Sequence, residues 1–404
     1  MRDTSLLQLA LGITPPWAVT RSDFDAAGRR LDIHIDFAPG RRFPCPSCGA
    51  AGCPAHDTEQ TTWRHLNFFQ HQAYLHARVP RVRCDLCGVK KIAVPWARPD
   101  SGFTLLFEAL LMSLVAAMPV NTVARLVGEH DTRLWRVIHH YVEHARARTD
   151  LAAVTRVAID ETAARRGHNY ITLFVDIDET RVVFATEGKD AETVAAFAGD
   201  LTAHGGTPEA VAEVCIDMSP GFIKGVADSL PRAAITFDKF RAVKIVNDAV
   251  DQVRRAERKA NSLLAGTRYI WLRNPASLSE RQRATLDSLP LRHLKTARAY
   301  QIRLAFQELY EQPSGPTGEA YLKRWYFWAT HSRLPPMIEA ARTIKRHWHG
   351  ILRWFNSRIA NGLIEGINSL VQAAKAKARG YRSIRNLKAM VYLLVGKLDL
   401  TLPA

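Results

Sequence analysis

Three carboxylates, separated by long intervals, have the neighbours expected of a site for divalent metal ions. Asp160 ends the apolar run V-A-I-D, and Asp217 ends a second run, V-C-I-D. Glu365 is the only acidic residue between Ala341 and Met390, a stretch with eleven Lys and Arg residues. Mg2+ prefers carboxylate oxygens, and two such ions promote phosphodiester cleavage. A lone carboxylate in so basic a strip indicates a metal ligand among phosphates, and the trio indicates chemistry on nucleic acid.

Each carboxylate taken singly is also consistent with an ordinary capping or surface residue. Four other acidic residues are equally plausible ligands from their local sequence, namely Glu161, Asp176, Asp178 and Asp238. Spacing alone therefore leaves the ligand set open. If the strands that end at Asp160 and Asp217 are neighbours, their carboxylates can share an ion, and Glu365 must then arrive on a helix packed against the sheet.

The segment around Glu365 has the pattern of such a helix. Its apolar residues recur with the helical period of 3.6, namely Ile364, Ile367, Val371 and Ala374. A polar stripe runs beside them, formed by Glu365, Asn368, Ser369 and Gln372. One face can pack while the adjacent face presents a metal ligand, then amides, then the downstream cations.

Two C-x-x-C motifs, each followed by Gly, indicate a zinc ribbon. The four cysteines are Cys45, Cys48, Cys84 and Cys87. Two such pairs suit one tetrahedral zinc ion, and the 35 residues between them contain strand-like text that fits a hairpin. The alternatives are a redox pair of C-x-x-C motifs, or a ligand supplied by Cys53 with His56. Cys215 is expected to be a buried small apolar residue.

Helical patterns between Phe103 and Arg148 contain a candidate helix-turn-helix unit. A short helix over 121–127 stops at Gly128, and the next begins at the cap candidate Asp131. If the latter reads DNA, the residues expected to face it are Thr132, Arg133, Arg136 and His140, with Arg125 reaching a phosphate. Trp135, Ile138 and Val142 would pack inward. An ordinary three-helix packing unit is the alternative.

The remaining patterns predict a mixed α/β fold preceded by a hairpin at residues 16–37. Strand-like runs follow Leu151, helices are expected over 191–204 and 220–229, and a further strand precedes Asp238. From 238 to about 354 nearly everything reads as helix, with breaks near Asn274, at 313–318 and at Pro335.

Net charge suggests a polyanionic partner. The chain has 404 residues, a formal net charge of +16 and a pI near 9.8, and clustered cations most often bind nucleic acid. A basic proteome or an acidic protein partner is the alternative. No secretory signal or membrane span is apparent. We therefore expect a cytoplasmic protein with no membrane contact, in which cysteines bind metal or remain free thiols.

Several motifs together resemble the ISL3 family of bacterial insertion-sequence transposases. They are C-P-S-C-G, R-C-D-L-C-G, V-A-I-D-E-T-A-A-R-R-G-H-N-Y, C-I-D-M-S-P-G-F-I-K, D-K-F-R-A-V-K and N-G-L-I-E-G-I-N-S, in an order that spans nearly the whole chain. The resemblance implies a DDE transposase whose acidic triad falls on Asp160, Asp217 and Glu365. One departure is visible, because Arg241 stands where similar proteins usually have His, and this puts full activity in question.

The resemblance also implies an α+β multidomain architecture with an RNase H-like catalytic core. We expect a β-hairpin region at 1–40, a zinc ribbon at 41–98 and a helix-turn-helix domain at 99–150. The core would comprise 151–254 and 341–398, interrupted by a helical insertion at 255–340, because Glu365 lies 148 positions after Asp217.

The implied mechanism is metal-dependent cleavage and strand transfer at the terminal inverted repeats of a mobile element. Asp160 would bridge two Mg2+ ions, or Mn2+, while Asp217 and Glu365 hold one each, and zinc would be structural. Backbone contacts to double-stranded DNA are expected from Lys244, Lys375, Arg379 and Arg382. The protein would be nucleoid-associated and would act on element ends and target as a homo-oligomer.

Two other hypotheses remain open at this point. One is a catalytically inactive, zinc-containing regulator that binds element ends without cutting them. The other is a structure-specific nuclease that cleaves in Mg2+ but never joins a 3′-end to a target. Tryptophans 271, 325 and 328 could stack on unpaired bases in the insertion, although a place in the core is the commoner role for tryptophan.

Overall fold

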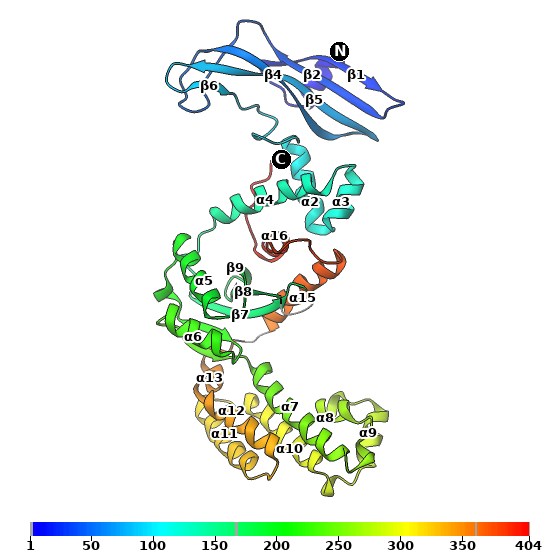
Figure 1. Cartoon of the computed structure of the whole chain (residues 1–404), viewed down its shortest axis with the longest axis vertical. Helices are drawn as coiled ribbons and strands as arrows, with labels where there is room; N and C mark the ends of the chain where they lie inside the picture. The colour runs from blue at the N-terminus through cyan, green and yellow to red at the C-terminus, as the bar shows by residue number, and fades with distance from the viewer. Residues whose placement is uncertain (1–2, 166–168, 360–361, 404) are drawn as a thin grey trace. The chain divides into compact units, whose positions relative to one another are not determined.

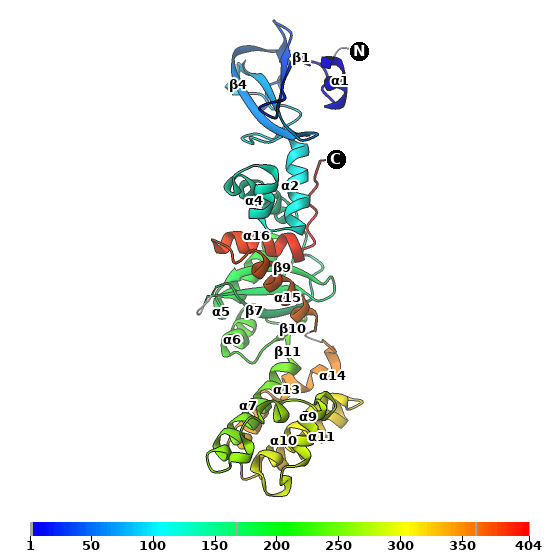
Figure 2. The same cartoon turned by 90° about the vertical axis from the view of Figure 1, so that its right-hand side faces the viewer.

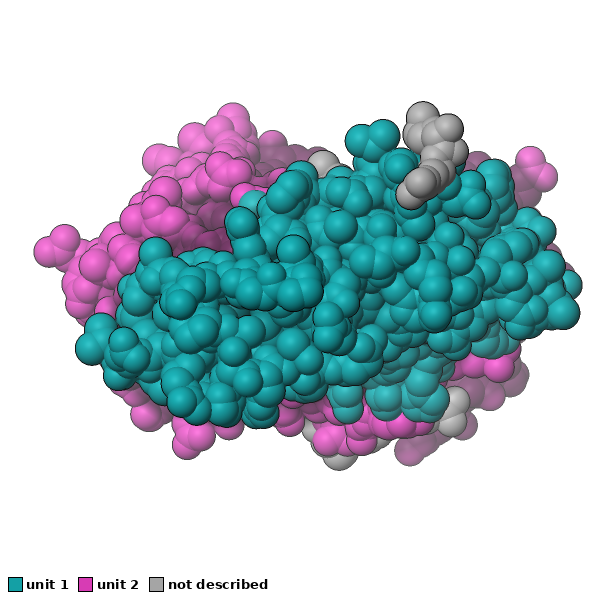
Figure 3. All heavy atoms as spheres, turned by 90° about the horizontal axis from the view of Figure 1, so that it is seen from above, with its two compact units in different colours: residues 1–141, 400–404 teal, residues 142–399 magenta. Residues whose placement is uncertain are grey.

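The chain divides into two compact units. The computed structural model describes residues 3–165, 169–359 and 362–403. One unit comprises residues 1–141 with 400–404, and the other comprises 142–399 (Figure 3). No helix among the described segments is long and apolar enough to cross a membrane.

Unit 1 is built on a six-stranded sheet that follows a short helix, α1 (Asp3–Ala10) (Figure 1). Its strands are β1 (Trp17–Asp25), β2 (Arg30–Phe37), β3 (Arg42–Phe43), β4 (Cys53–Phe68), β5 (His71–Cys84) and β6 (Gly88–Lys91). The strand order is β1-β2-β5-β4-β3, and β6 also pairs with β5. Antiparallel pairing of β1 with β2 confirms the expected hairpin. Strict alternation in β2 buries Leu31, Ile33 and Ile35 on one face of the sheet.

Three helices follow the sheet in unit 1: α2 (Leu105–Ala117), α3 (Val120–Val127) and α4 (Asp131–Ala147), the last of which continues past Tyr141 into unit 2. Thr104 caps α2 by accepting a hydrogen bond from the N–H of Phe107. Gly128 ends α3 in the left-handed conformation, with φ of 72°, which glycine adopts without a steric cost. The turn between α3 and α4 therefore forms at the predicted residue.

Unit 2 contains a five-stranded mixed sheet. Its strands are β7 (Arg156–Ala163), β8 (Tyr170–Asp176), β9 (Arg181–Glu187), β10 (Glu213–Ile216) and β11 (Ala234–Phe237), in the order β11-β10-β7-β8-β9. The first three form an antiparallel meander, and β10 and β11 run parallel to β7. This mixed sheet confirms the α/β pattern predicted after Leu151.

Helices cover both faces of this sheet (Figure 2). The predicted helices at 191–204 and 220–229 form as α5 (Ala191–Ala203) and α6 (Pro220–Ser229) on one face. Residues from β7, β10, α5 and α6 share one apolar core. On the other face lie α15 (Gly362–Lys377) and α16 (Ile384–Val395).

A helical region lies between β11 and α15. Its helices are α7 (Lys239–Arg258), α8 (Arg268–Leu272), α9 (Glu280–Asp287), α10 (Lys295–Glu308), α11 (Gly315–Thr330), α12 (Pro335–Arg346), α13 (Trp348–Leu352) and α14 (Trp354–Ser357). The expected breaks mark helix starts, since Ser314 caps α11 and Pro335 opens α12. Trp271 and Trp325 are buried in the core of this region, whereas Trp328 is 42% exposed.

Candidate functional site

Sheet register brings three aspartates to one edge of the sheet in unit 2. The parallel ladders pair Cys215 with Ala158 and Ile216 with Phe237. Continued by one or two residues, the same register sets Asp217 between Asp160 and Asp238. Asp217 and Asp238 follow the carboxyl ends of β10 and β11, whereas the expectation that a strand ends at Asp160 is wrong, because β7 continues to Ala163. Neighbouring strands lie about 4.8 Å apart, so these three carboxylates form one row.

Helix α15 runs along β7 and carries polar side chains to that row. Asn368 Nδ2 donates a hydrogen bond to Asp160 Oδ2 at 2.8 Å. One turn further, Gln372 Nε2 donates to Thr162 Oγ1 at 2.5 Å. The predicted apolar stripe is buried at Ile364, Ile367 and Val371, which fixes the rotation of the helix.

Glu365 therefore starts the polar face whose next turn contacts Asp160. Its side chain is exposed, and its negative charge contributes to the raised pKa of Asp238, for which burial is the largest cause. The two carboxylates are thus close enough for their charges to interact. The strand register sets Asp160 beside Asp217, and Glu365 lies one turn before Asn368 on α15.

Crowded negative charge dominates the electrostatics of this edge. Burial raises the pKa of Glu161, and the charge of Asp217 raises it further. Arg241 opposes this excess, since its Nη2 donates to Asp160 Oδ1 at 2.9 Å. Burial alone would lower the pKa of Arg241, but the charges of Asp160, Asp217 and Asp238 outweigh it and the pKa is raised. The row therefore attracts cations.

The donor set fits a hard divalent cation. The side chains of the three aspartates offer carboxylate oxygens, which are the ligands that Mg2+ prefers. Asn368 Oδ1 is also buried and has no hydrogen-bond partner in the described part of the chain, and a buried acceptor of this kind calls for an ion or a water. The carboxylates are not gathered as tightly as the zinc-ribbon thiols. Over residues 3–165, 169–359 and 362–403, only those thiols form a group of three or more donors within 4.8 Å of one another.

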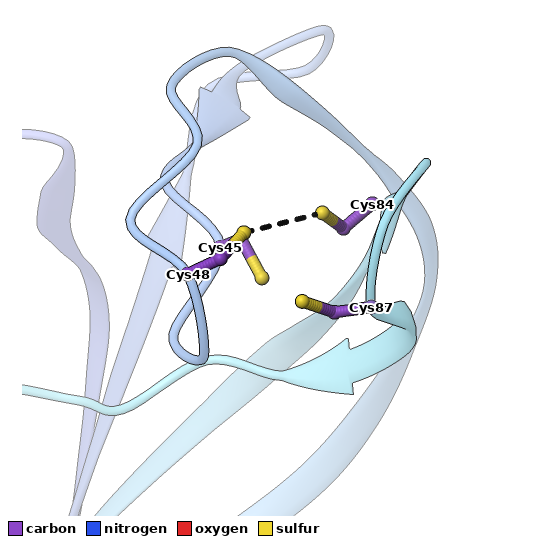
Figure 4. Close-up of side chains that lie close together, drawn as sticks. All are labelled: Cys45, Cys48, Cys84 and Cys87. Atoms are coloured by element: carbon purple, nitrogen blue, oxygen red, sulfur yellow. Dashed lines mark hydrogen bonds between the residues drawn. The ribbon is translucent and has the colours of Figure 1, made fainter.

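Four thiols in unit 1 form a ready zinc site (Figure 4). Cys45 and Cys48 come from the loop after β3, and Cys84 and Cys87 flank the turn between β5 and β6. The Sγ atoms of Cys48 and Cys84 are 3.6 Å apart, close to the ~3.8 Å edge of a tetrahedron with ~2.3 Å Zn–S bonds. Backbone N–H groups of Cys48 and Ser47 lower the pKa of Cys45 to about 6, which favours the thiolate that binds metal.

The two other cysteines lie outside this group. Cys53 is buried, and its Sγ donates to the carbonyl of Ala50 at 3.5 Å. Cys215 is buried in β10, as expected of a small apolar residue. The four thiols that the structure gathers are therefore the cysteines of the paired motifs.

The DNA-facing residues predicted on α4 have different surroundings. Thr132 and Arg136 are exposed. Arg133 forms an ion pair with Glu129, and its guanidinium lies 4.2 Å from the ring centroid of Phe103. His140 is half-buried beside Tyr141. Exposed Thr132 and Arg136 are thus better placed than Arg133 for a new partner.

Further cations surround the helices. Arg125 is exposed on α3 and donates to the carbonyl of Asn121, and Lys244 on α7 pairs with Asp248 at 3.0 Å. Lys375 Nζ donates to the carbonyl of Ala163 at 2.5 Å, which ties α15 to β7.

Two more of the predicted backbone contacts follow α15. Arg379, with φ of 56°, and Arg382 are exposed in the segment between α15 and α16. These positions leave both side chains accessible to a phosphate.

Asp238 is the site residue that the sequence analysis did not select. It ends the run A-I-T-F-D, the same signal that singles out Asp160 and Asp217. Its position at the end of an apolar run could be recognised from the sequence. The strand order that sets β11 beside β10 could not be predicted from the sequence. The contacts of Asn368 and Arg241 with Asp160 depend on the same topology.

Comparisons with known families cover most of the chain. Residues 157–391 match a family model described as a transposase, residues 92–142 match a helix-turn-helix domain of transposase family ISL3, and residues 41–87 match the zinc finger of the IS204/IS1001/IS1096/IS1165 transposases. The four zinc-binding cysteines lie within the last match.

Two curated relatives align over almost their whole lengths. The transposase for insertion sequence element IS1557 of Mycobacterium tuberculosis is 28% identical, with 100% of this chain and 98% of the relative covered. The transposase for insertion sequence element IS1001 of Bordetella parapertussis is 26% identical, with 95% and 96% covered.

Proposed function

Since the chain belongs to the ISL3 family of DNA transposases, we propose that it cleaves and joins DNA at a two-metal site formed by Asp160, Asp217 and Glu365. The observation that carries this proposal is the register of the parallel strands, which aligns Asp160 with Asp217. The contact of Asn368 with Asp160 supports the part assigned to α15. A mixed sheet covered by helices on both faces supports an RNase H-like core.

The residues of the site divide the work of binding and orientation. Asp160, Asp217 and Glu365 would hold the two ions, with Asp160 between the other two ligands. Bound Mg2+ supplies activation of the attacking hydroxyl and stabilisation of the leaving oxygen. Asn368 and Gln372 keep α15 against β7, so that Glu365 keeps its place relative to the strand ends. No side chain needs to act as a nucleophile, because positioning and charge provide the acceleration.

DNA binding is shared among the parts of the chain. The zinc ribbon and the helix-turn-helix domain bind the terminal inverted repeats of an insertion sequence, with Thr132, Arg136 and His140 toward the bases and Arg125 and Arg133 toward the backbone. Phosphate contacts near the core come from Lys244, Lys375, Arg379 and Arg382. The protein acts as a homo-oligomer on DNA, because two element ends must be held together.

Substitution of the proposed ligands tests this function. Asp160→Asn, Asp217→Asn and Glu365→Gln should each keep the affinity for terminal-repeat DNA and lower Mg2+-dependent cleavage by about a thousandfold or more. Asp228→Asn, at an exposed residue on α6 that pairs with Lys224, is the matched control and should cleave like the wild type. Binding is measured by fluorescence anisotropy and cleavage on labelled duplexes.

The same assay separates the proposal from the competing functions. A wild-type protein that binds ends but never cleaves them in Mg2+ or Mn2+ would be an inactive regulator. Cleavage without transfer of the 3′-end to a target duplex would be the activity of a nuclease. Unimpaired cleavage by all three variants would remove these residues from the site.

A further inference from the structure

Arg241 is a cation in direct contact with one of the proposed metal ligands. It lies in the first turn of α7, three residues after Asp238, and its Nη2 donates to Asp160 Oδ1. The other oxygen of the same carboxylate accepts from Asn368. Both oxygens of Asp160 are therefore engaged by protein donors, one of which carries a full positive charge.

The two donors on Asp160 differ in how firmly they are held. Asn368 is part of α15, which Gln372 and Lys375 also tie to β7. The Arg241 side chain is 43% exposed, whereas that of Asp160 is 16% exposed. Within the described residues, its guanidinium has one ion pair, to Asp160. A long side chain held at one end of a half-exposed pair can turn toward solvent or a phosphate without disturbing the fold.

Charge balance gives Arg241 a reason to occupy this position. Asp160, Asp217 and Asp238 all act on its guanidinium. Three carboxylates on neighbouring strands repel one another, and a cation among them relieves that repulsion. A divalent ion bound by Asp160 would provide the same relief and would repel the guanidinium. The ion and Arg241 thus compete for one carboxylate.

We propose that Arg241 is a positioning residue that holds Asp160 until divalent cations bind, and then turns its guanidinium to a phosphate of the bound DNA. This inference rests on the proposed metal-dependent function. DNA binding would draw Arg241 away from Asp160 and so remove a competitor of the metal. Metal binding would in turn release the Arg241 guanidinium to contact a DNA phosphate. Metal and DNA must then bind cooperatively, with the same coupling in both directions.

The test measures Mn2+ affinity of the zinc-loaded full-length protein by electron paramagnetic resonance, with and without terminal-repeat duplex. Without DNA, Arg241→Gln should bind Mn2+ about fivefold more tightly than the wild type, the upper range for loss of a half-exposed ion pair. DNA should raise the Mn2+ affinity of the wild type and have a smaller effect on the variant. Arg241→Lys keeps the charge and should restore part of the coupling.

Controls distinguish failure of this inference from failure of the proposed function. Arg258→Gln changes an exposed arginine at the far end of α7 and should bind Mn2+ like the wild type. Asp160→Asn should lose Mn2+ binding, and retention of full binding there would overturn the proposed catalytic site itself. Equal or weaker Mn2+ binding by Arg241→Gln, or binding by neither protein, would overturn the competition between Arg241 and metal.

Discussion

Asp238 is buried beside Asp217 in the row of aspartates, and it also caps helix α7. Its carboxylate accepts a hydrogen bond from the N–H of Phe240 at 2.9 Å, which closes the first turn of α7. Burial raises its pKa even though this bond, the N–H of Arg241 and the Arg241 charge all oppose the rise. The hydrogen bond of Asp238 therefore stabilises the start of α7. Its buried negative charge, by contrast, lowers the free energy of unfolding.

Two substitutions at position 238 separate those effects. Asp238→Asn keeps a capping oxygen and removes the charge, so the metal-free variant should melt at a higher temperature than the wild type at pH 7. The raised pKa means that the penalty exists when the carboxylate is ionised and disappears as the pH falls through the folded-state pKa. The difference in melting temperature should therefore shrink on acidification.

Asp238→Ala is the contrasting variant, because it loses the cap as well. Relative to Asp238→Asn, it should lose about 1 kcal/mol of stability, or about 2–4 °C in melting temperature. An Asp238→Asn variant that is less stable than the wild type at neutral pH would contradict the buried-charge argument.

Between elements, the contact of β4 with the start of α2 joins the sheet of unit 1 to its helices. The N–H of Arg64 donates to the carbonyl of Gly102, and the carbonyl of Arg64 accepts from the N–H of Thr104. His65 Nδ1 lies 2.9 Å from Thr104 Oγ1. Burial, with a smaller effect of Arg64, lowers the pKa of His65 to about 4, so this histidine is neutral in the folded unit.

His65 should make unit 1 sensitive to acid. Its pKa is about 6.5 in the unfolded chain, so protons favour unfolding below that pH. The contribution of neutral His65 to the free energy of unfolding is fully present above pH 6.5. Below that pH the free energy of unfolding should fall by about 1.4 kcal/mol per pH unit, down to pH 4. His65→Asn should flatten that slope in denaturant titrations monitored by tryptophan fluorescence.

Exposed His56, in the same strand, provides the control. His56→Asn should follow the wild-type pH profile. Because acid acts on the zinc thiolates of all three proteins alike, the difference between the profiles reports on His65. A wild-type slope in His65→Asn would refute the assignment.

Elements were predicted more completely from the sequence than the contacts between them. Helix α6, the Gly128 turn and the buried face of α15 follow from local capping and periodicity. Arg133, which is predicted to face DNA, also pairs with Glu129 and lies beside Phe103, and the contact with Phe103 spans 30 positions in the chain. Trp135 was expected to pack inward and is only partly buried. The spacing of apolar residues along the chain does not reveal the order of strands or the packing between distant elements. These contacts therefore could not be predicted.

At the scale of the whole molecule, the sheets of the two units belong to different apolar clusters. The sheet core of unit 1 contains Cys45, Cys53 and Cys84, and Cys87 packs against it. The core of unit 2 extends from the sheet through the helical region and contains none of the four zinc-binding cysteines. Metal binding should therefore stabilise only the part of the chain that holds the thiols.

Removal of zinc should separate DNA-end binding from the stability of unit 2. Cys45→Ser or Cys84→Ser should lose specific affinity for terminal-repeat DNA, because the ribbon cannot close without its tetrahedral metal. The calorimetric transition of unit 2 should keep its midpoint. Cys53→Ala removes a buried thiol of the same core that lies outside the four-thiol group, and it should retain zinc and end binding. If the serine variants still bound the repeats with wild-type affinity, zinc would have no part in DNA recognition, and the reader of the element ends would have to lie elsewhere in the chain.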